Sequence, residues 1–354
     1  MPTSTDSEVV AALAAQVREA GRRHNALKIR GGGSKSFLGR RTAGRTLDVS
    51  ALTGVVDYQP TELVITARGG ASLRDVEGLL AANGQMLACE PPDFGKGGTV
   101  GGMVASGLAG PRRPFAAAVR DCVLGVTLLD GRGRTLRFGG TVFKNVAGFD
   151  AFRLMAGAMG TLGVLLDISL RVAPRPRTER SLAFEEPWAD SQARLGELMR
   201  RPLPLSGAFH DGKVLRLRLS GTERAVEHGA AEIGGDAGDL SVWTELRHHR
   251  LPIFAAQRLW RLSIPRTAEL ADLPGAQLID WAGAQRWLAS NVPTSEIREA
   301  ARAAGGHATL FQGAVDGEEV YDRPPEALFQ LHRRVKAALD PAGVFNRGRL
   351  WEDL

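Results

Sequence analysis

A run of glycines in the first half of the chain carries the clearest chemical signal in this sequence. Residues 94–110 read FGKGGTVGGMVASGLAG and contain seven glycines but only one charged side chain. Glycine loses more conformational freedom on folding than any other residue and has no side chain to pack, so this density requires a compensating reason. The usual reason is that bare backbone N–H groups donate hydrogen bonds to an anion such as a phosphate.

A second anion cradle is expected at GGGSKS, residues 31–36. It follows a predicted strand, Leu27–Arg30, and offers the backbone N–H groups from Gly31 to Ser34 and the hydroxyl of Ser34 as donors. Neither run matches a standard nucleotide motif. Thr99 interrupts a G-x-G-x-x-G pattern, and Ser34 stands where a Walker A motif needs glycine. The sequence therefore predicts a phosphate-bearing ligand outside the Rossmann and P-loop classes.

Short strands alternate with helices around these two runs, which favours the α/β or the α+β class. A proline-rich segment, VAPRPRTE at 172–179, marks the expected end of this first domain, because its prolines are incompatible with a helix. All six tryptophans lie after residue 175, so the composition changes at the same place. The predicted elements of the first domain are helices at 7–22, 72–83 (capped by Ser72) and 150–155, strands at 27–30, 46–49, 63–67 and 164–172, and a hairpin that turns at Asp130-Gly131.

Residues 176–325 are predicted to form a second, smaller domain with a compact antiparallel sheet and helices on one face. A last helix at 325–339 is expected to end before Pro341. The other predicted elements of the second half are strands at 181–184, 258–264, 276–281 and 306–311, a hairpin that turns at Asp211-Gly212, and helices at 188–200, 223–233 and 294–304.

Basic charge is concentrated in the first half. Residues 1–175 hold 22 Lys and Arg against 14 Asp and Glu, a balance of +8, whereas residues 176–354 hold 23 against 25, a balance of −2. The arginines are scattered and are not interleaved with exposed aromatic residues, so nucleic acid is not an expected partner. A phosphate-bearing cofactor and an acidic partner surface account for the asymmetry, and a solvated arginine-rich surface remains the alternative.

Length, cysteine content and hydropathy bear on the number of domains, on the cellular compartment and on metal binding. The 354 residues suffice for two domains with full cores. The polar start MPTSTDSEVV is unlike a signal peptide, and no stretch reaches the roughly 18 apolar residues of a membrane helix. Cys89 and Cys122 are too few for a disulfide framework and lack metal-ligand spacing. We therefore expect a cytoplasmic protein without a metal site.

Several motifs, in order along the chain, resemble the vanillyl-alcohol oxidase family of flavoproteins with its PCMH-type FAD-binding domain. They are RGGGSK, GGTVGGMVASG, VRDCVLGVTLLDGRG, KNVAGFD, GTLGVLLDISLRVAP and LDPAGVFNRGRL. More narrowly, EPPDFG, GLAGPRRP, FKNVAGFDAFRLMAG and FNRGRLW resemble the FAD-binding E subunits of bacterial glycolate oxidase complexes. The resemblance implies an α+β fold with a two-lobed FAD-binding domain at 1–175 (lobes about 26–94 and 95–175), an α+β cap at 176–325 and a segment at 326–354 that returns to the FAD domain.

The resemblance also implies which residues surround FAD. The two glycine runs would hold the pyrophosphate from two sides, and residues 160–164 would line the adenosine. FAD is expected to bind without a covalent link, because relatives that tether the flavin carry a histidine where this chain has Ser34. A valine at Gly98 or Gly101 is expected to abolish FAD binding. The expected cofactor-binding residues are Arg30, Gly31, Gly32, Gly33, Ser34, Gly98, Val100, Gly101, Gly102, Gly160, Thr161, Gly163 and Val164, with Pro92 and Thr99 toward the flavin ring and Asn346 and Arg349 closing the flavin end.

The implied function is that of an FAD-binding subunit of a multi-subunit glycolate dehydrogenase, which oxidises a small 2-hydroxy acid, glycolate, to glyoxylate and passes electrons to its partners. The implied partners are a second FAD-binding subunit (GlcD-like) and an iron–sulfur subunit (GlcF-like). Such a complex would also allow peripheral association with the inner face of the membrane. Two alternatives remain: a self-sufficient flavin-dependent 2-hydroxy acid oxidase or dehydrogenase, and a scaffold subunit without flavin.

The catalytic residue is unknown, and His307 in GGHATLF is the one candidate, although a lone histidine on an apolar strand is more often a core residue. Larger relatives carry a GHxGDGNxH segment that supplies metal ligands and a base, whereas GGHATLFQGA keeps one histidine. Arg258 and Arg261 could hold a carboxylate, but nothing pairs either with a base. We therefore expect substrate oxidation on a partner subunit. Lys144 and Asn145 are further candidates for contact with the cofactor.

Overall fold

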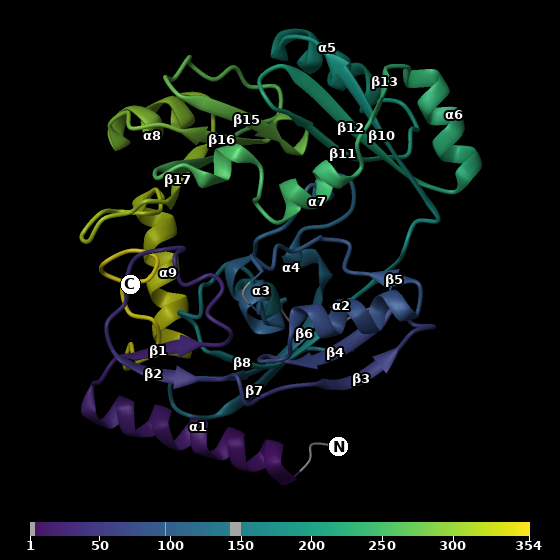
Figure 1. Ribbon diagram of the computed structural model, residues 1–354. Helices are drawn as coiled ribbons and strands as arrows, with labels where there is room; N and C mark the ends of the chain where they lie inside the picture. The colour runs from purple at the N-terminus through teal and green to yellow at the C-terminus, as the bar shows by residue number, and fades with distance from the viewer. Residues whose placement is uncertain (1–3, 96, 142–149) are drawn as a thin grey trace.

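The computed structural model describes residues 4–95, 97–141 and 150–354. Its strands form a five-stranded sheet within residues 55–171, an eight-stranded sheet within residues 178–312 and two small two-stranded sheets. The five-stranded sheet lies in the lower half of Figure 1 and the eight-stranded sheet in the upper half. Sheets with helices on their faces confirm the predicted α+β class.

The first 171 residues build the lower half of the molecule. The elements are α1 (Ser4–Arg23), β1 (Leu27–Arg30), β2 (Arg45–Asp48), β3 (Val55–Gln59), β4 (Val64–Arg68), α2 (Leu73–Ala82), β5 (Gln85–Met86), α3 (Val100–Ser106), α4 (Val119–Cys122), β6 (Val123–Leu129), β7 (Thr135–Gly139), the 3₁₀ helix η1 (Ala151–Met155) and β8 (Val164–Arg171).

The five-stranded sheet is antiparallel, in the order β3-β4-β8-β6-β7. Strands β4 and β8 are largely buried on both faces, and polar side chains of the two strands pair with each other: Thr66 Oγ1 lies 2.9 Å from Ser169 Oγ, and Arg68 forms an ion pair with Asp167. One face, with Ile65 and Ile168, packs on α2 and α3. The other face, with Leu129 and Leu166, packs on α1, which lies below the sheet in Figure 1. The sheet thus serves as the core of the lower half.

Several local features predicted for this half from the sequence are present in the structure. Ser72 caps α2, since its hydroxyl accepts a hydrogen bond from Asp75 N at 3.3 Å. Strands β6 and β7 pair across the predicted Asp130-Gly131 turn. Helix α3 was not expected, because it forms inside the glycine run; Thr99 caps it by accepting from Gly102 N at 3.1 Å. The segment 151–155, expected as a helix, is a 3₁₀ helix.

The expected lobe boundary near residue 94 does not follow the sheets. Strands β3 and β4, from the expected first lobe, pair with β8 from the second. Only β1 and β2 stand apart, as a parallel pair, and β1 is extended by a bridge between Leu27 and Phe345 of the C-terminal tail. The partner of β4 lies about 100 residues further along the chain, and the sequence patterns of single strands do not specify such pairings.

The second half begins with an extended crossing segment, as its prolines predict. The elements are β9 (Ala173–Pro174), which pairs with β5, then β10 (Thr178–Glu185), α5 (Trp188–Leu198), β11 (Leu205–His210), β12 (Val214–Gly221), α6 (Glu223–Ile233), β13 (Asp236–Gly238), α7 (Ser241–Arg247), η2 (Pro252–Ala255), β14 (Leu259–Ser263), β15 (Ala276–Asp280), η3 (Trp281–Gly283), β16 (Gln285–Ala289), α8 (Thr294–Ala303), β17 (His307–Gln312) and α9 (Glu326–Leu339).

The eight-stranded sheet is antiparallel, in the order β13-β10-β12-β11-β15-β16-β14-β17. Its outer face packs on α5, α6 and α8, as predicted. Its inner face, with Phe209 and Trp287, packs on α7 and on apolar residues of the lower half such as Leu108. Strand β16 was missed by the sequence prediction.

The chain returns to the lower half through α9 and the residues after it (Figure 1). Val344 and Phe345 are fully buried in the core beneath the five-stranded sheet. Lys336 fixes this return, because its buried ammonium donates to Thr161 O at 2.6 Å, to Asp340 Oδ2 at 2.7 Å and to Phe345 O at 2.9 Å. All three donors of this ammonium therefore have acceptors.

A buried ion network joins the two halves. Glu90 of the lower half accepts from Arg112 Nε at 3.1 Å and from Arg218 Nη2, on β12, at 2.8 Å. Arg112 Nη2 also donates to Glu179 Oε1, on β10, at 2.6 Å. Burial alone would raise the pKa of Glu90, but the Arg218 and Arg112 guanidiniums hold it below its usual value. The network therefore keeps its charges paired inside the junction.

Candidate functional site

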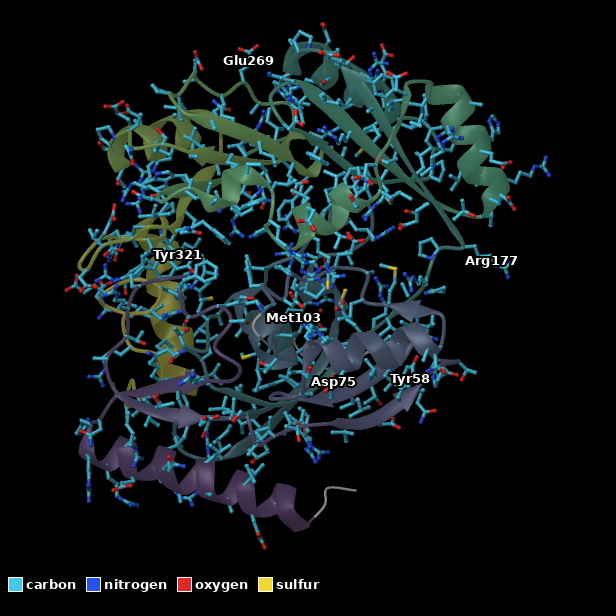
Figure 2. All side chains as sticks on the ribbon, viewed as in Figure 1. Tyr58, Asp75, Met103, Arg177, Glu269 and Tyr321 are labelled. Atoms are coloured by element: carbon cyan, nitrogen blue, oxygen red, sulfur yellow. The ribbon has the colours of Figure 1, made fainter. Side chains whose placement is uncertain are left out.

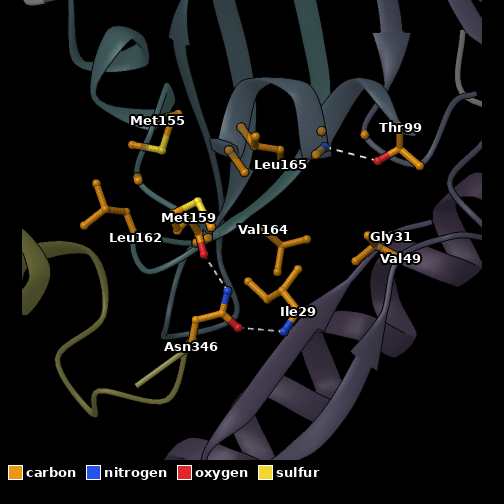
Figure 3. A pocket seen from close by; sticks show the side chains of 17 residues that line it. Ile29, Gly31, Val49, Thr99, Met155, Met159, Leu162, Val164, Leu165 and Asn346 are labelled. Atoms are coloured by element: carbon orange, nitrogen blue, oxygen red, sulfur yellow. Dashed lines mark hydrogen bonds between the residues drawn. The ribbon is translucent and has the colours of Figure 1, made fainter. Parts of the chain in front are cut away.

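Two adjoining pockets open where the two glycine runs meet. We call the first the polar pocket; its lining includes Lys28, Gly31–Ser36 and Arg349. The second, the apolar pocket, has a largely aliphatic wall and is shown in Figure 3. The pockets form one continuous crevice because they share seven lining residues: Ile29, Gly31, Thr99, Gly102, Ala105, Met159 and Asn346.

The two glycine runs touch each other at the crevice. A methyl group at Gly32 would lie 1.9 Å from Gly97 O, and one at Gly31 would lie 2.8 Å from Thr99 Oγ1. Neither position therefore accepts a side chain without displacement of the opposite run. Glycine is therefore needed at 31 and 32 because the other glycine run packs directly against these positions. The sequence alone did not indicate this contact.

The first run presents free donors, as predicted. The backbone N–H groups of Gly32, Gly33 and Ser34 donate to no acceptor within residues 4–95, 97–141 and 150–354. Successive N–H groups of this kind form an anion-binding concavity. The first cradle therefore has the donors that a phosphate needs.

The second run differs from the expectation. Its N–H groups at Val100, Gly101 and Gly102 donate to Ala71 O, Gly69 O and Thr99 Oγ1, respectively. These three groups are already occupied, so they do not form a bare cradle. Gly101 is required for another reason, because a methyl group there would lie 2.6 Å from Gly69 O. The run brings α3 against β4, and this contact shapes the crevice wall.

Lys35 is a site residue that the sequence prediction missed, although GGGSK contained it. Its ammonium is buried in the polar pocket and contacts Ser34 Oγ at 3.4 Å, and none of the described carboxylates lies within ion-pair distance of it. Burial lowers the pKa of Lys35 to about 8, and Asp93 opposes this shift. A buried cation beside free N–H donors favours an anionic ligand.

The C-terminal tail closes the crevice. Arg349 donates to the carbonyl groups of Arg40, Lys35 and Ser36 at 3.0, 3.4 and 3.2 Å, so it fixes the loop that follows the first glycine run. Asn346 lies between the pockets and donates to Met159 O at 2.6 Å (Figure 3). Both residues line the crevice, as expected, but the polar atoms named here are engaged with the protein backbone.

Most of the expected cofactor residues lie together, and their contact with FAD stays a prediction. Pro92, Gly98, Val100 and Thr161 are not among the residues that line either pocket; Val100 and Thr161 belong to the buried interior. The expected residues that line the crevice are Arg30, Gly31, Gly32, Gly33, Ser34, Thr99, Gly101, Gly102, Gly160, Gly163, Val164, Asn346 and Arg349.

The remaining candidates are separate from the crevice. His307 is exposed on β17, the edge strand of the upper sheet, and lines neither pocket. Arg258 forms an ion pair with Glu318. Lys144 and Asn145 lie outside the described residues. In the part of the chain that the structure describes, no three His, Cys, Asp or Glu side chains are grouped as metal ligands.

The crevice fits FAD chemically. Free N–H groups and the Lys35 ammonium suit a diphosphate. The neighbouring apolar pocket suits an aromatic ring system. Its wall is formed by Ile29, Val49, Met155, Met159, Leu162, Val164 and Leu165.

Comparisons with known proteins agree with this chemistry. Residues 7–139 match a family model described as an FAD binding domain. Glycolate oxidase subunit GlcE of Escherichia coli (strain K12) is 48% identical over 97% of both chains. Glycolate oxidase subunit GlcD of Bacillus subtilis (strain 168) is 27% identical over 49% of this chain and 37% of its own. Among solved structures, an alkyldihydroxyacetonephosphate synthase has the same fold, with a TM-score of 0.64 and 14% identity, over 94% of this chain and 74% of that one.

The family model and the similarity to GlcE place the chain among the FAD-dependent oxidoreductases, as a flavoprotein with a PCMH-type FAD-binding domain. Within this class the chain belongs to the family of the E. coli glycolate oxidase subunit GlcE. The resemblance seen in the sequence motifs is therefore confirmed, as is FAD as the cofactor.

Proposed function

We propose that this chain is the FAD-binding subunit of a multi-subunit glycolate dehydrogenase that oxidises glycolate to glyoxylate. One observation supports the proposal most directly. The Lys35 ammonium is buried beside the free N–H groups of Gly32–Ser34, and none of the described carboxylates forms an ion pair with it. The similarity to GlcE over nearly the whole of both chains supplies the substrate. A bound flavin supplies reversible two-electron redox chemistry, which the side chains of the crevice do not provide.

The residues of the crevice bind and orient the cofactor. In this arrangement the diphosphate lies in the polar pocket, where Lys35 and the first glycine run neutralise its charge. The adenosine lies in the apolar pocket, against Met159 and Val164. Arg349 fixes the loop over the diphosphate by its three backbone contacts. We propose that the flavin is bound without a covalent link, because Ser34 stands where tethering relatives carry a histidine.

We propose a division of the chain into three parts. The FAD-binding domain comprises residues 1–175, the cap comprises residues 176–325, and residues 326–354 return to the FAD domain. The crossing segment at β9 and the burial of Val344 and Phe345 in the lower core support this division.

The partners we propose are a GlcD-like second FAD-binding subunit and a GlcF-like iron–sulfur subunit. The partial similarity to B. subtilis GlcD supports a common origin of the two flavoproteins. Within the described residues no helix combines the length and apolar character that crossing a bilayer requires. We propose that any contact with a membrane is peripheral and depends on the complex.

Affinity purification of the chain from its native cells tests the proposal. We expect the eluate to be yellow and to contain a second flavoprotein and an iron–sulfur protein, with glycolate-dependent dye reduction. A colourless chain would favour a scaffold without flavin. A yellow chain that elutes alone and turns over glycolate would favour a self-sufficient dehydrogenase.

A further inference from the structure

A third pocket lies between the FAD-binding domain and the cap, next to the crevice. We call it the junction pocket. Ser106 lines both the junction pocket and the polar pocket, so the two are adjacent. Its wall includes Arg113 and Arg120 from the FAD-binding domain and Arg261 and Tyr321 from the cap, and none of the described residues that line it is an aspartate or glutamate, although Asp121 pairs with Arg120 nearby. The pocket therefore concentrates positive charge at the junction.

The strand register of the cap directs Arg261 toward the FAD-binding domain. On β14, Arg261 stands opposite Trp287 of β16 and Thr309 of β17. Trp287 belongs to the core that packs on the lower half. Trp260 and Leu262, which flank Arg261 along β14, belong instead to the core on the outer face with α8. Because side chains alternate between the faces of a strand, Arg261 lies on the inner face.

Arg261 has no partner of its own among the described residues. Its guanidinium forms no hydrogen bond or ion pair within residues 4–95, 97–141 and 150–354. Arg258, three residues earlier, is different, because it is paired with Glu318 and donates to Thr294 Oγ1 at 3.1 Å. Of the two candidate arginines Arg258 and Arg261, Arg261 is therefore the one available to a ligand.

Arg113 reaches the same pocket from the other domain. Its neighbour Arg112 is held in the buried network with Glu90 and Glu179. Arg113 instead stacks over the ring of Trp281 at 4.2 Å and, in the described part of the chain, has no carboxylate partner. The stacking orients the guanidinium but leaves its N–H donors free.

Two half-buried cations that face one pocket destabilise each other. Burial lowers the pKa of Arg261, and Arg113 lowers it further, while Tyr321 opposes the shift. Tyr321 is placed beside Thr309 of β17 and lies at the junction of the two halves in Figure 2. Its phenol is a third donor at this point. An anion bound in the pocket would relieve the repulsion between the guanidiniums.

We propose that the junction pocket binds the carboxylate of a small 2-hydroxy acid between Arg261 and Arg113, with Tyr321 as an additional donor. This assignment rests on the proposed function, which supplies the class of acid. A planar carboxylate matches the paired N–H groups of a guanidinium. A bound acid would lie beside the crevice, since Ser106 borders both pockets.

Calorimetric titration of the full chain with glycolate tests the assignment, with FAD content measured on each sample. We expect glycolate to bind to the wild type, and ethylene glycol, which lacks the carboxylate, not to bind. Arg261→Ala and Arg113→Ala should each weaken glycolate binding by about 10- to 100-fold, the loss typical of a charge-assisted hydrogen bond. Arg261→Lys, which keeps the charge without the paired donors, should give a smaller loss.

The control is Arg224→Ala, which removes the same charge from an exposed position on α6 and should bind glycolate as the wild type does. Unchanged glycolate affinity in both Arg261→Ala and Arg113→Ala would overturn the assignment. So would inorganic phosphate that binds more tightly than glycolate. If the variants retain FAD, failure of the titration refutes the junction pocket alone, whereas a wild type without FAD refutes the proposed function.

Discussion

Asn346 Oδ1 accepts a hydrogen bond from the backbone N–H of Ile29 at 2.9 Å, and this contact joins the C-terminal tail to the first strand of the chain. The same amide donates to Met159 O at 2.6 Å. One buried side chain therefore holds three segments that are distant in the sequence at the middle of the crevice (Figure 3). The shape of the proposed FAD site depends on this contact.

Replacement of Asn346 should open the crevice. Asn346→Ala leaves Ile29 N and Met159 O without partners, and we expect a loss of about 2–4 kcal/mol in the free energy of unfolding, with lower FAD content. Asn346 has φ +40°, so Asn346→Gly is the control that removes the amide without backbone strain. Denaturant titration checks the result, and wild-type stability of both variants would contradict it.

The glycines at 98 and 101 should behave differently from each other. A methyl group at Gly101 would lie 2.6 Å from Gly69 O, whereas one at Gly98 would meet Lys35 Nζ and the Asp93 backbone at ordinary distances, 3.5 and 3.6 Å. Gly101→Ala should therefore displace α3 and strongly reduce FAD content, and Gly98→Ala should have little effect. This revises the expectation that both positions are equally sensitive. Equal FAD content in the two variants would show that the contact with Gly69 is unimportant.

FAD affinity should fall as the pH rises through about 8. The pKa of Lys35 in the free protein is lowered to about 8 by burial, so its ammonium is present below that pH and is lost above it. Because an anionic diphosphate binds the protonated form, FAD binding requires proton uptake at higher pH, and its affinity declines by at most about tenfold per pH unit. Fluorescence titration of the apoprotein with FAD between pH 6.5 and 9.5, chosen as roughly 1.5 units either side of this pKa, measures the decline.

Two variants of Lys35 complete this test. Lys35→Met should bind FAD more weakly at pH 7, without the decline near pH 8, because it has no titrating group. Lys35→Arg retains a permanent charge and should also lack the decline. A pH-independent affinity in the wild type would mean that Lys35 does not contact the diphosphate.

The flavin should be released completely by acid. The first glycine run carries Ser34 where relatives that tether the flavin carry a histidine, so the residue that would form the covalent bond is not present at that position. After precipitation with trichloroacetic acid, we expect all the yellow colour in the supernatant. A yellow pellet would reveal a covalent link and would disprove the prediction.

The isolated chain should not oxidise glycolate, even though it binds the acid. Among the described residues that line the junction pocket there is no histidine, aspartate or glutamate to accept the hydroxyl proton. Burial raises the pKa of Tyr321, with only partial opposition from Arg261 and Arg349, so the phenol remains protonated at neutral pH. Dye reduction by the purified chain with glycolate should be at background. Sustained reduction that His307→Ala abolishes would make this chain the catalytic subunit.

The sequence by itself determined the features that depend on neighbouring residues. The cap at Ser72, the Asp130-Gly131 hairpin and helix α6 match their predicted positions, because each depends on hydrogen bonds and periodicity within a few residues. The donors of Gly32–Ser34 were predictable for the same reason. The family motifs, read in order, also identified FAD as the cofactor.

Only the tertiary structure decided which residues distant in the sequence meet. It pairs β4 with β8 across the expected lobe boundary and places Gly101 against Gly69. It also places Arg113 and Arg261 in one pocket, with none of the described carboxylates within ion-pair distance of either, while their neighbours Arg112 and Arg258 are paired with carboxylates. The sequence does not show whether an arginine is paired with a carboxylate. Its availability to a ligand depends on which acidic groups the fold brings within a few ångströms.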